Sequence, residues 1–378
     1  MSRRGNGEGS VFRRADGRWV GEAYVLQPNG GRARRTVYGR TREEVAAKVT
    51  AMLSKAAAGH VAPSSWTVAE FVEYWLDNVG ASSLRATTLS SYRWILANYV
   101  VPEVGSEKLA ALTPPHVRKM LARLAARELS WNSRRLAHSV LRTVLADAVR
   151  EQLIERNAAA LVKLRREHVP EVVPWTPVEA ARFLAASQGD RLYALFAVGV
   201  SLGLRRGELM GLRWEDVDLR TGLMRVEHSL SRVPGVGFVL GPPKSARSRR
   251  ALWIPEICLQ ALRAHWDLEV AARERLGSSW QESGYVFTAP RGGPLDPTVL
   301  AHVFERLVAA AGVRRIRVHD LRHTCASLLL AQGVAPRVVM EVLGHAQLSV
   351  TMDLYSHVMP TALNDAAKAV QRALDGPA

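Results

Sequence analysis

The pattern of hydrophobic and polar positions divides the chain into three parts, of which the first is a small N-terminal module at residues 1–60. The runs 11–26 and 31–39 have strand character and are separated by a turn rich in Gly and Asn. A helical run follows Thr41, a residue type that caps helix N-termini. We therefore expect a small α+β module, a three-stranded sheet with one helix.

The second part, residues 66–165, has helical periodicity throughout. Thr67 precedes a run whose apolar positions fall on one helical face, namely Val68, Phe71, Val72, Trp75 and Leu76. Further helix starts are expected at Thr87 or Thr88, at Thr113 before two prolines, and after Asn132. This pattern predicts an independent all-α domain.

The third part spans residues 174–378 and follows a charged, proline-punctuated linker at 163–175. It is helical except for three short strand-like runs, 223–230, 238–240 and 251–254. A short amphipathic helix is expected at 361–374. The pattern predicts a mainly α domain with a small antiparallel sheet and a C-terminal tail helix.

The amino-acid composition indicates what kind of partner the chain binds. The formal net charge is +16 and the pI is about 10.5, which favours a polyanion. The charge alone is weak evidence, because 44 of the 51 basic residues are Arg and such a bias can be genome-wide. Two cysteines, a polar N-terminus and no apolar run long enough to span a bilayer indicate a cytoplasmic protein without membrane contact.

Arginines in the first two parts are candidates for DNA contact. In the predicted sheet and helical domain they are Arg13, Arg14, Arg34, Arg35, Arg85, Arg134 and Arg135. The alternatives are a solvated basic ribbon and a helical bundle that only connects its neighbours. The residues alone leave both open.

Candidate chemistry begins at Arg205, in the segment GLRRGELMGLRW. An apolar helix ends near Gly203 and another begins by Glu208, so Arg205 lies at a tight junction between buried elements. A guanidinium there needs an anion, and Glu208 is near enough to orient it. Taken alone, the pair reads as structural.

Lys244 is the only lysine between Glu171 and Ala367. It lies between two predicted strands, where a hairpin turn could project it. A lysine can lose its proton near other cations, whereas arginine stays protonated, so Lys244 is a candidate general acid. The alternative is an ordinary exposed turn lysine.

His319 and Arg322 are three residues apart in VHDLRHTCASLLL and can face one phosphate from one side of a helix. His319 and His323 also have the spacing of a zinc-protease helix, but no third ligand is evident. Asp216 and Asp218 read as turn residues and not as a metal pair.

The last candidates, His345 and Tyr355, lie in VLGHAQLSVTMDLYSHV. A lone histidine is usually only hydrogen-bonded, and a lone tyrosine usually packs in a core. Because both follow the motifs of Arg205 and of His319 and Arg322, a functional role for the two residues becomes more favourable than these usual roles. No acidic cluster nearby suggests a bound metal, which favours metal-free chemistry on a phosphodiester.

Taken in order, these motifs resemble the tyrosine recombinase family, of the phage-integrase type. The pattern is an arginine in GLRRGEL, a loop lysine, HxxR within HDLRHT, LGH, and a tyrosine ten residues later. The resemblance implies the tyrosine recombinase fold, with residues 174–378 as the catalytic domain. It also implies a core-site DNA-binding domain at 66–165 and an arm-type DNA-binding module at 1–60.

The resemblance further implies a role for each candidate. Tyr355 would attack a DNA phosphodiester and form a 3′-phosphotyrosine, Arg205 and Arg322 would clamp the phosphate, and Lys244 would protonate the leaving 5′-oxygen. His319 would assist proton transfer from Tyr355, and His345 would donate a hydrogen bond to the phosphate. Glu208 would support Arg205 and His319. No cofactor or metal is implied.

The function implied is a site-specific recombinase that integrates or excises a phage or mobile element. Its expected partners are double-stranded DNA attachment sites and three further copies, in a tetramer with a Holliday-junction intermediate. An excisionase and a host DNA-bending protein are further partners that the family allows. The alternative is a catalytically idle DNA-binding regulator on the same fold. The helix at 361–374 would dock on a neighbouring protomer or pack on its own domain.

Overall fold

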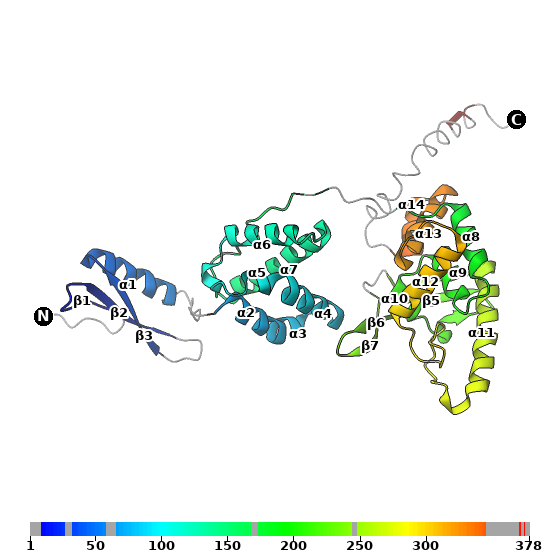
Figure 1. The fold of residues 1–378 in the computed structure, drawn as a ribbon, viewed down its shortest axis with the longest axis horizontal. Helices are drawn as coiled ribbons and strands as arrows, with labels where there is room; N and C mark the ends of the chain where they lie inside the picture. Colours follow the sequence, from blue (N-terminus) through cyan, green and yellow to red (C-terminus); the bar gives the residue numbers. More distant parts are fainter. Residues whose placement is uncertain are drawn as a thin grey trace. The chain divides into compact units, whose positions relative to one another are not determined.

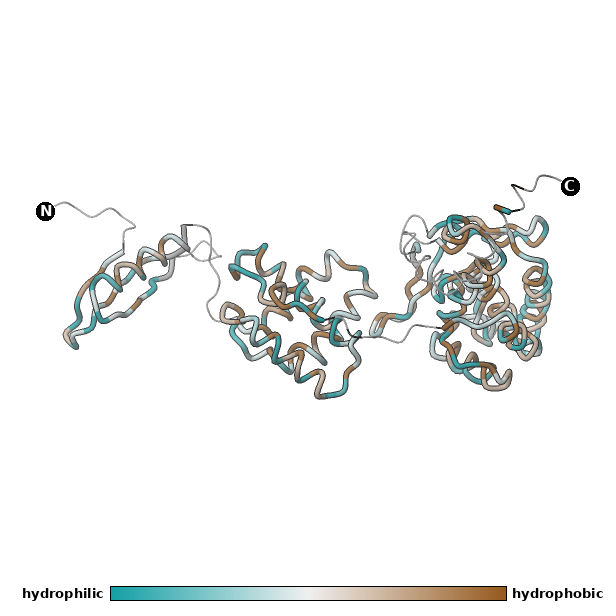
Figure 2. Tube along the Cα trace, turned by 90° about the horizontal axis from the view of Figure 1, so that it is seen from above, coloured by the Kyte–Doolittle hydropathy of each residue, from teal (hydrophilic) through white to brown (hydrophobic). Residues whose placement is uncertain are grey.

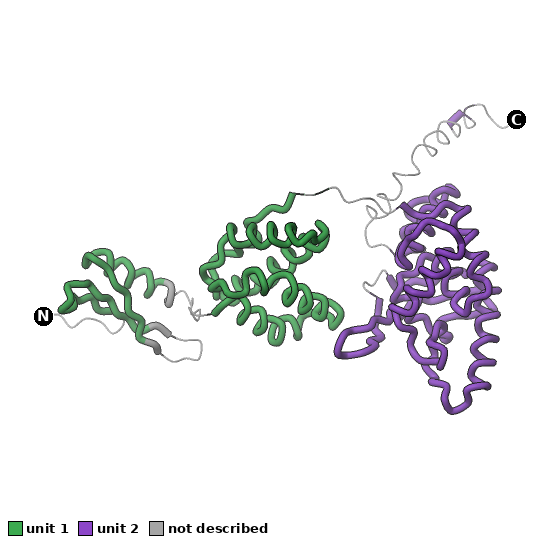
Figure 3. The backbone as a smooth tube through the Cα atoms, viewed as in Figure 1, with its two compact units in different colours: residues 1–169 green, residues 170–378 purple. Residues whose placement is uncertain are grey.

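The computed structural model forms two compact units, residues 1–169 and 170–378 (Figure 3). Figure 1 labels most of the helices and strands of both units. The structure describes residues 9–26, 32–57, 66–165, 167, 173–243, 248–344, 370–371 and 374.

The N-terminal module is a three-stranded antiparallel sheet in the order β1-β2-β3 with one helix against it, as the strand and cap signals predict. Ala23, Val45 and Val49 form its small core between the sheet and the helix. The elements are β1 (Ser10–Arg13), β2 (Trp19–Leu26), β3 (Arg32–Gly39) and α1 (Arg42–Ala57).

The helical domain at 66–165 is all α within its described residues and has its own core. Thr67 caps the first helix in a capping box with Glu70, as expected of a threonine at that position. A π-helical turn connects α2 to α3, and another connects α4 to α5, so that each pair forms one continuous helical run. The helices are α2 (Val68–Tyr74), α3 (Ala81–Ser83), α4 (Ala86–Ile95), α5 (Val101–Val104), α6 (Pro114–Ala126) and α7 (Trp131–Arg150).

Two of the predicted helix starts in this domain are displaced by one or two residues. α4 begins after Arg85 and not at Thr87 or Thr88, and α7 is capped by Ser130, whose side chain accepts from the amide of Ser133. The domain core encloses Trp75, whose indole nitrogen donates to Asp147 at 2.7 Å. Hydrophobic residues recur along these helices in Figure 2, as expected for helices that bury one face.

The second unit is mainly helical, with short strands that position its loops. α9 is buried along most of its length and lies against α8, α11 and α13. Residues 280–296 interrupt the expected run of helices with irregular chain. The helices are α8 (Pro177–Ser187), α9 (Tyr193–Leu202), α10 (Arg206–Met210), α11 (Glu256–Leu276), α12 (Pro297–Ala311), α13 (Leu321–Ala331) and α14 (Pro336–Leu343).

The strands of this unit form two small antiparallel sheets instead of one. One has the order β4-β5-β8 and the other is the hairpin β6-β7. The loop with Lys244 therefore joins two sheets, because β7 pairs with β6 and β8 pairs with β5, and the expected hairpin turn is wrong. The strands are β4 (Val217–Asp218), β5 (Leu223–Val226), β6 (Ser229–Val233), β7 (Gly237–Gly241) and β8 (Arg250–Trp253).

The predicted tail helix at 361–374 lies outside the described residues except at 370, 371 and 374. None of the helices in the described part of the chain is long and apolar enough to cross a membrane. The three-part division of the chain stays a prediction. The N-terminal sheet and the helical domain nevertheless have separate cores, and residues 58–65 between them are not described.

Aromatic packing in the core of the second unit predicts a specific loss of stability. Phe183 is fully buried on α8 and its ring contacts those of Trp175, Phe196 and Phe304. Phe183→Ala should lower the free energy of unfolding by about 3–5 kcal/mol, because it leaves a cavity among rings that cannot collapse. The measurement is the urea midpoint of this unit's unfolding transition in the full chain.

The matched control is Val178→Ala on the same helix, where the side chain is 65% exposed. That change should alter the free energy by less than about 0.5 kcal/mol. Equal losses for the two variants would contradict the assignment of the core.

Candidate active site

The junction between α9 and α10 positions the first candidate arginine. Gly203 ends α9 with φ +61°, and a Cβ there would lie 2.4 Å from Leu343. Only glycine fits both the left-handed backbone and the close packing. Two residues later, Arg205 stands at the N-terminus of α10, so the position of its side chain is fixed by the junction of the two helices.

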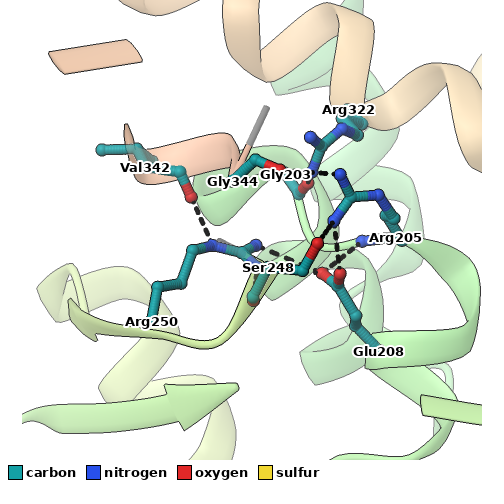
Figure 4. Close-up of polar contacts among 8 residues, drawn as sticks. All are labelled: Gly203, Arg205, Glu208, Ser248, Arg250, Arg322, Val342 and Gly344. Atoms are coloured by element: carbon teal, nitrogen blue, oxygen red, sulfur yellow. Dashed lines mark hydrogen bonds and ion pairs between the residues drawn. The ribbon is translucent and has the colours of Figure 1, made fainter. Parts of the chain in front are cut away.

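The carboxylate of Glu208 organises this site (Figure 4). Its side chain is 1% exposed. Oε1 accepts from Nη1 of Arg205 at 2.6 Å, and Oε2 accepts from the Arg205 amide at 3.1 Å. Oε2 also accepts from Nη1 and Nη2 of Arg250, each at 3.2 Å. The predicted support of Arg205 by Glu208 is therefore present, and a second guanidinium shares the same carboxylate.

Arg205 also binds two other elements. Its Nη1 donates to Oγ of Ser248 at 3.1 Å and its Nη2 donates to the carbonyl of Gly344 at 2.8 Å. Ser248 is fully buried and follows the loop that contains Lys244. Gly344 immediately precedes His345. The one guanidinium thus contacts the chain next to two other predicted site residues.

Arg322 lies at the start of α13 with only 3% of its surface exposed. Nη1 donates to the carbonyl of Gly203 at 2.9 Å, while Nη2 is buried with no hydrogen-bond partner among the described residues. Burial, and after it the charge of Arg205, lowers the pKa of Arg322 to about 9, so the group is still charged at neutral pH. A buried, charged donor without a partner costs stability unless a ligand completes it.

The charges of the cluster do not balance. Within the part of the chain that the structure describes, three guanidinium groups, those of Arg205, Arg250 and Arg322, surround the one carboxylate of Glu208. Three positive charges less one negative charge leave an excess of two. An anion is the ligand that such a site selects.

His319 lies in a single 3₁₀ turn, Val318–Asp320, just before α13, and not on the helix itself as the spacing suggests. Desolvation, followed by the charges of His323 and Arg322, holds the pKa of His319 below its usual value of 6.5. The neutral imidazole, which can accept a proton, is therefore favoured at neutral pH. Among the described residues, the hydrogen bonds of Glu208 go to Arg205 and Arg250, and the expected support of His319 by this carboxylate stays a prediction.

The alternative that His319 and His323 bind zinc in a hydrolase is not supported by the geometry. The rings of His319 and His323 stand 5.9 Å apart, and the intervening Asp320 is paired with Arg317. In the described part of the chain no third potential ligand joins them, since no group of three His, Cys, Asp or Glu side chains is placed to hold a metal.

Of the two aspartates in the segment WEDVDL, Asp218 serves as expected for a turn residue, whereas Asp216 pairs with a histidine. Asp218 accepts from the amides of Arg220 and Thr221, at 2.9 and 3.0 Å. Asp216 lies 3.1 Å from Nδ1 of His228.

Lys244, His345 and Tyr355 lie outside the described residues. The structure therefore brings together Arg205, Glu208 and Arg322, with His319 one turn before Arg322. It also adds Arg250, which sequence reasoning missed because Arg250 follows Arg249 in a basic run that resembles a solvated loop. The alternation of side chains along β8 could have revealed it. Arg250 lies on the same face of the strand as buried Leu252, whereas Ala251 and Trp253 are exposed on the other face.

The predicted DNA-contact arginines differ in their availability. On the N-terminal module Arg13, Arg14, Arg34 and Arg35 are exposed, although Arg34 is paired with Glu22. Arg34 stands opposite Tyr24, which is 66% exposed on the sheet face away from α1.

In the helical domain, Arg85 and Arg135 are exposed, and Arg135 lies over the ring of Trp131. Arg134 is largely buried and donates to Glu167 at 2.6 Å and to the carbonyl of Leu129 at 3.1 Å. Its charge is thus already partnered within the protein.

Comparison with known proteins covers both units. The model described as "Phage integrase family" matches residues 176–361, a span that includes Lys244, His345 and Tyr355, and the model "Phage integrase central domain" matches residues 68–165. An integrase of Saccharopolyspora erythraea is 25% identical over 97% of this chain and 96% of its own length. A "Tyrosine recombinase XerC-like" protein of Caldanaerobacter subterraneus is 27% identical over 90% of this chain and 92% of its own.

Solved structures agree on the fold. The Tn1549 transposon integrase in complex with transposon right-end DNA has a TM-score of 0.67 at 23% identity, covering 82% of this chain and 100% of that one. A lambda integrase tetramer bound to a Holliday junction has a TM-score of 0.55 at 16% identity, covering 93% and 96%. On the two family matches, which together cover residues 68–165 and 176–361, the chain belongs to the phage integrase family of tyrosine recombinases.

Proposed function

We propose that this chain is a site-specific DNA recombinase that cuts and rejoins DNA through a 3′-phosphotyrosine formed by Tyr355. The observation that carries the proposal is the guanidinium cluster around Glu208, in which Nη2 of Arg322 is buried and has no acceptor among the described residues. A non-bridging oxygen of the scissile phosphate supplies that acceptor.

Charge supports the same ligand. A phosphodiester carries a single negative charge, and charge builds further on its oxygens as the tyrosine oxygen attacks. The excess positive charge of Arg205, Arg250 and Arg322 over Glu208 is suited to that change. Donors already fixed in place need no reorganisation during the reaction, which is how such sites lower a barrier.

The proton transfers follow from the residues that flank the cluster. A free tyrosine has a pKa near 10, so Tyr355 needs a proton acceptor at neutral pH, and His319 with its lowered pKa is suited to that step. The Tyr355 oxygen forms a bond to phosphorus as the bond to the 5′-oxygen breaks. Lys244 donates a proton to that leaving oxygen, and His345 donates a hydrogen bond to the phosphate.

No cofactor or metal is required by this scheme. One phosphodiester is exchanged for another of similar energy, and the covalent intermediate keeps the bond for resealing by a 5′-hydroxyl. Attack by a hydroxyl from a second duplex exchanges strands. Two duplexes need four active protomers, so we propose a tetramer on DNA with a Holliday-junction intermediate.

The biological reaction that we propose is integration or excision of a phage or mobile element at DNA attachment sites, in the cytoplasm and on the nucleoid. An excisionase and a host DNA-bending protein are the proposed accessory partners. Exposed arginines of the N-terminal sheet and of the helical domain are the proposed DNA contacts, of which Arg34 beside Tyr24 offers charge and an aromatic surface together.

The nucleophile can be tested directly. Tyr355→Phe should bind DNA as tightly as the natural chain but form no covalent adduct, because only the phenol oxygen is lost. The substrate is a nicked duplex with the element's attachment site, taken from the junction beside the gene, and adducts are read by denaturing gel. Adducts formed by Tyr355→Phe would overturn the assignment, and binding without adducts by the natural chain would favour the idle regulator.

The phosphate clamp predicts a defect in rate. Arg322→Lys keeps the charge but loses the planar fork, so the single-turnover rate of adduct formation should fall about 100-fold at unchanged affinity for DNA. The matched control is Arg315→Lys, because that arginine is 79% exposed and pairs with Glu305 on the surface. A rate within about twofold of the natural chain for Arg322→Lys would remove this residue from the clamp.

The proposed base predicts a pH dependence. Only neutral His319 can accept a proton, and its pKa lies below 6.5. The acidic decline of the rate should therefore fall at a lower pH than the 6.5 at which an ordinary histidine is half protonated. His319→Asn should lower the rate and remove this acidic decline, while His302→Asn, at an exposed position, should change neither. An acidic decline that persists in His319→Asn would exclude His319 as its source.

A further inference from the structure

Arg250 is a charged residue that lies almost wholly inside the catalytic domain. It begins β8 and its side chain is 7% exposed. Nε donates to the carbonyl of Val342 at 2.6 Å, and Nη1 donates to the carbonyl of Ser248 at 2.9 Å. Nη1 and Nη2 both donate to Oε2 of Glu208 at 3.2 Å. These contacts join three separate segments of the unit (Figure 4).

The contact with Glu208 bears on Arg205. The carboxylate divides its oxygens, since Oε1 accepts from the side chain of Arg205 and Oε2 accepts from Arg250 and from the Arg205 amide. Without Arg250, Oε2 would keep only the bond from the Arg205 amide, and the carboxylate would be held less firmly. The guanidinium of Arg205, which otherwise rests on Ser248 and Gly344, would then be less precisely oriented.

The contact with Val342 bears on the other side of the site. The last carbonyls of a helix have no partner within the helix and carry partial negative charge. At the end of α14, Arg250 binds the carbonyl of Val342 and Arg205 binds that of Gly344. Both guanidinium groups hold the helix end from which the chain continues to His345.

The guanidinium of Arg250 is nearly saturated by these partners. It has five N–H donors, and the hydrogen bonds above occupy four of them. Arg322, by contrast, keeps Nη2 free of any described partner. Arg250 therefore has little capacity left for a substrate and must act through the groups that it holds.

We infer that Arg250 is a positioning residue for DNA cleavage, which orients Arg205 through Glu208 and anchors the end of α14 next to His345. The inference rests on the proposed role of Arg205 as a phosphate clamp. Arg250 contributes to the rate of strand cleavage and not to affinity for DNA.

The test compares Arg250→Met and Arg250→Lys with Arg249→Met in the full chain. Arg249 is the adjacent, exposed arginine of the same basic run. Adduct formation is measured in single turnover on the nicked attachment-site duplex, with DNA affinity measured by fluorescence anisotropy. We expect a rate loss of about 100-fold for Arg250→Met, since a misplaced catalytic group can cost that much. Arg250→Lys should recover part of the rate, and Arg249→Met should match the natural chain.

A substrate with a methylphosphonate at the cleavage site separates positioning from simple loss of structure. It lacks one negative oxygen and depends less on a correctly oriented Arg205. The loss caused by Arg250→Met should therefore be at least tenfold smaller on methylphosphonate than on phosphate. In the same assay, adding Arg250→Met to Glu208→Gln should lower the rate on phosphate by clearly less than Arg250→Met does alone, since both changes remove the contact between Arg250 and Glu208.

Equal losses on the two substrates, or full additivity with Glu208→Gln, would overturn the inference. A natural rate for Arg250→Met would overturn it as well. Should Arg250→Met fail to fold, Arg250→Lys is subjected to the same substrate comparison, with the same outcomes deciding. Failure of the proposed function itself would look different, because the natural chain would then form no adduct on either substrate.

Discussion

The buried carboxylate of Glu208 is the constraint on which the catalytic domain depends. It takes hydrogen bonds from Arg205 and Arg250 in a place that water hardly reaches. Such an arrangement is costly to desolvate, and removal of one partner leaves an uncompensated charge. The domain accepts this cost because the two guanidinium groups also hold the carbonyls of Val342 and Gly344, so that α10, β8 and the end of α14 meet at one point.

The preference of the cluster for an anion follows from its balance of charges. Glu208 neutralises one of three arginines, and the remaining charge is held at positions set by backbone carbonyls such as that of Gly203. Because burial raises the free-energy cost of each charged guanidinium, the proposed scissile phosphate would stabilise the cluster. On the proposed function, the residues that stabilise the local fold are also the ones that bind the substrate, so stability and function are linked.

Much of this could be predicted from residue order. Gly203, Arg205 and Glu208 lie within six residues, so a helix end, a glycine in left-handed conformation and an N-terminal carboxylate already define the first half of the site. The N-terminal sheet and the all-α domain follow from periodicity and caps in the same way. Local patterns of this kind need no knowledge of distant contacts.

Other features depend on contacts that no local pattern contains. Arg250 meets Glu208 across 42 positions and Val342 across 92, so its basic neighbourhood gave no sign of burial. The pairing of β8 with β5 and not with β7 is likewise set by the core beneath the sheet, which is why the hairpin at Lys244 was wrong.

The most direct measurement is a crystal structure of the Tyr355→Phe chain bound to its attachment-site duplex. The account predicts a non-bridging oxygen of the scissile phosphate about 3 Å from Nη2 of Arg322, with Arg205 on the same phosphate. A scissile phosphate bound elsewhere, with Nη2 of Arg322 still lacking an acceptor, would contradict it.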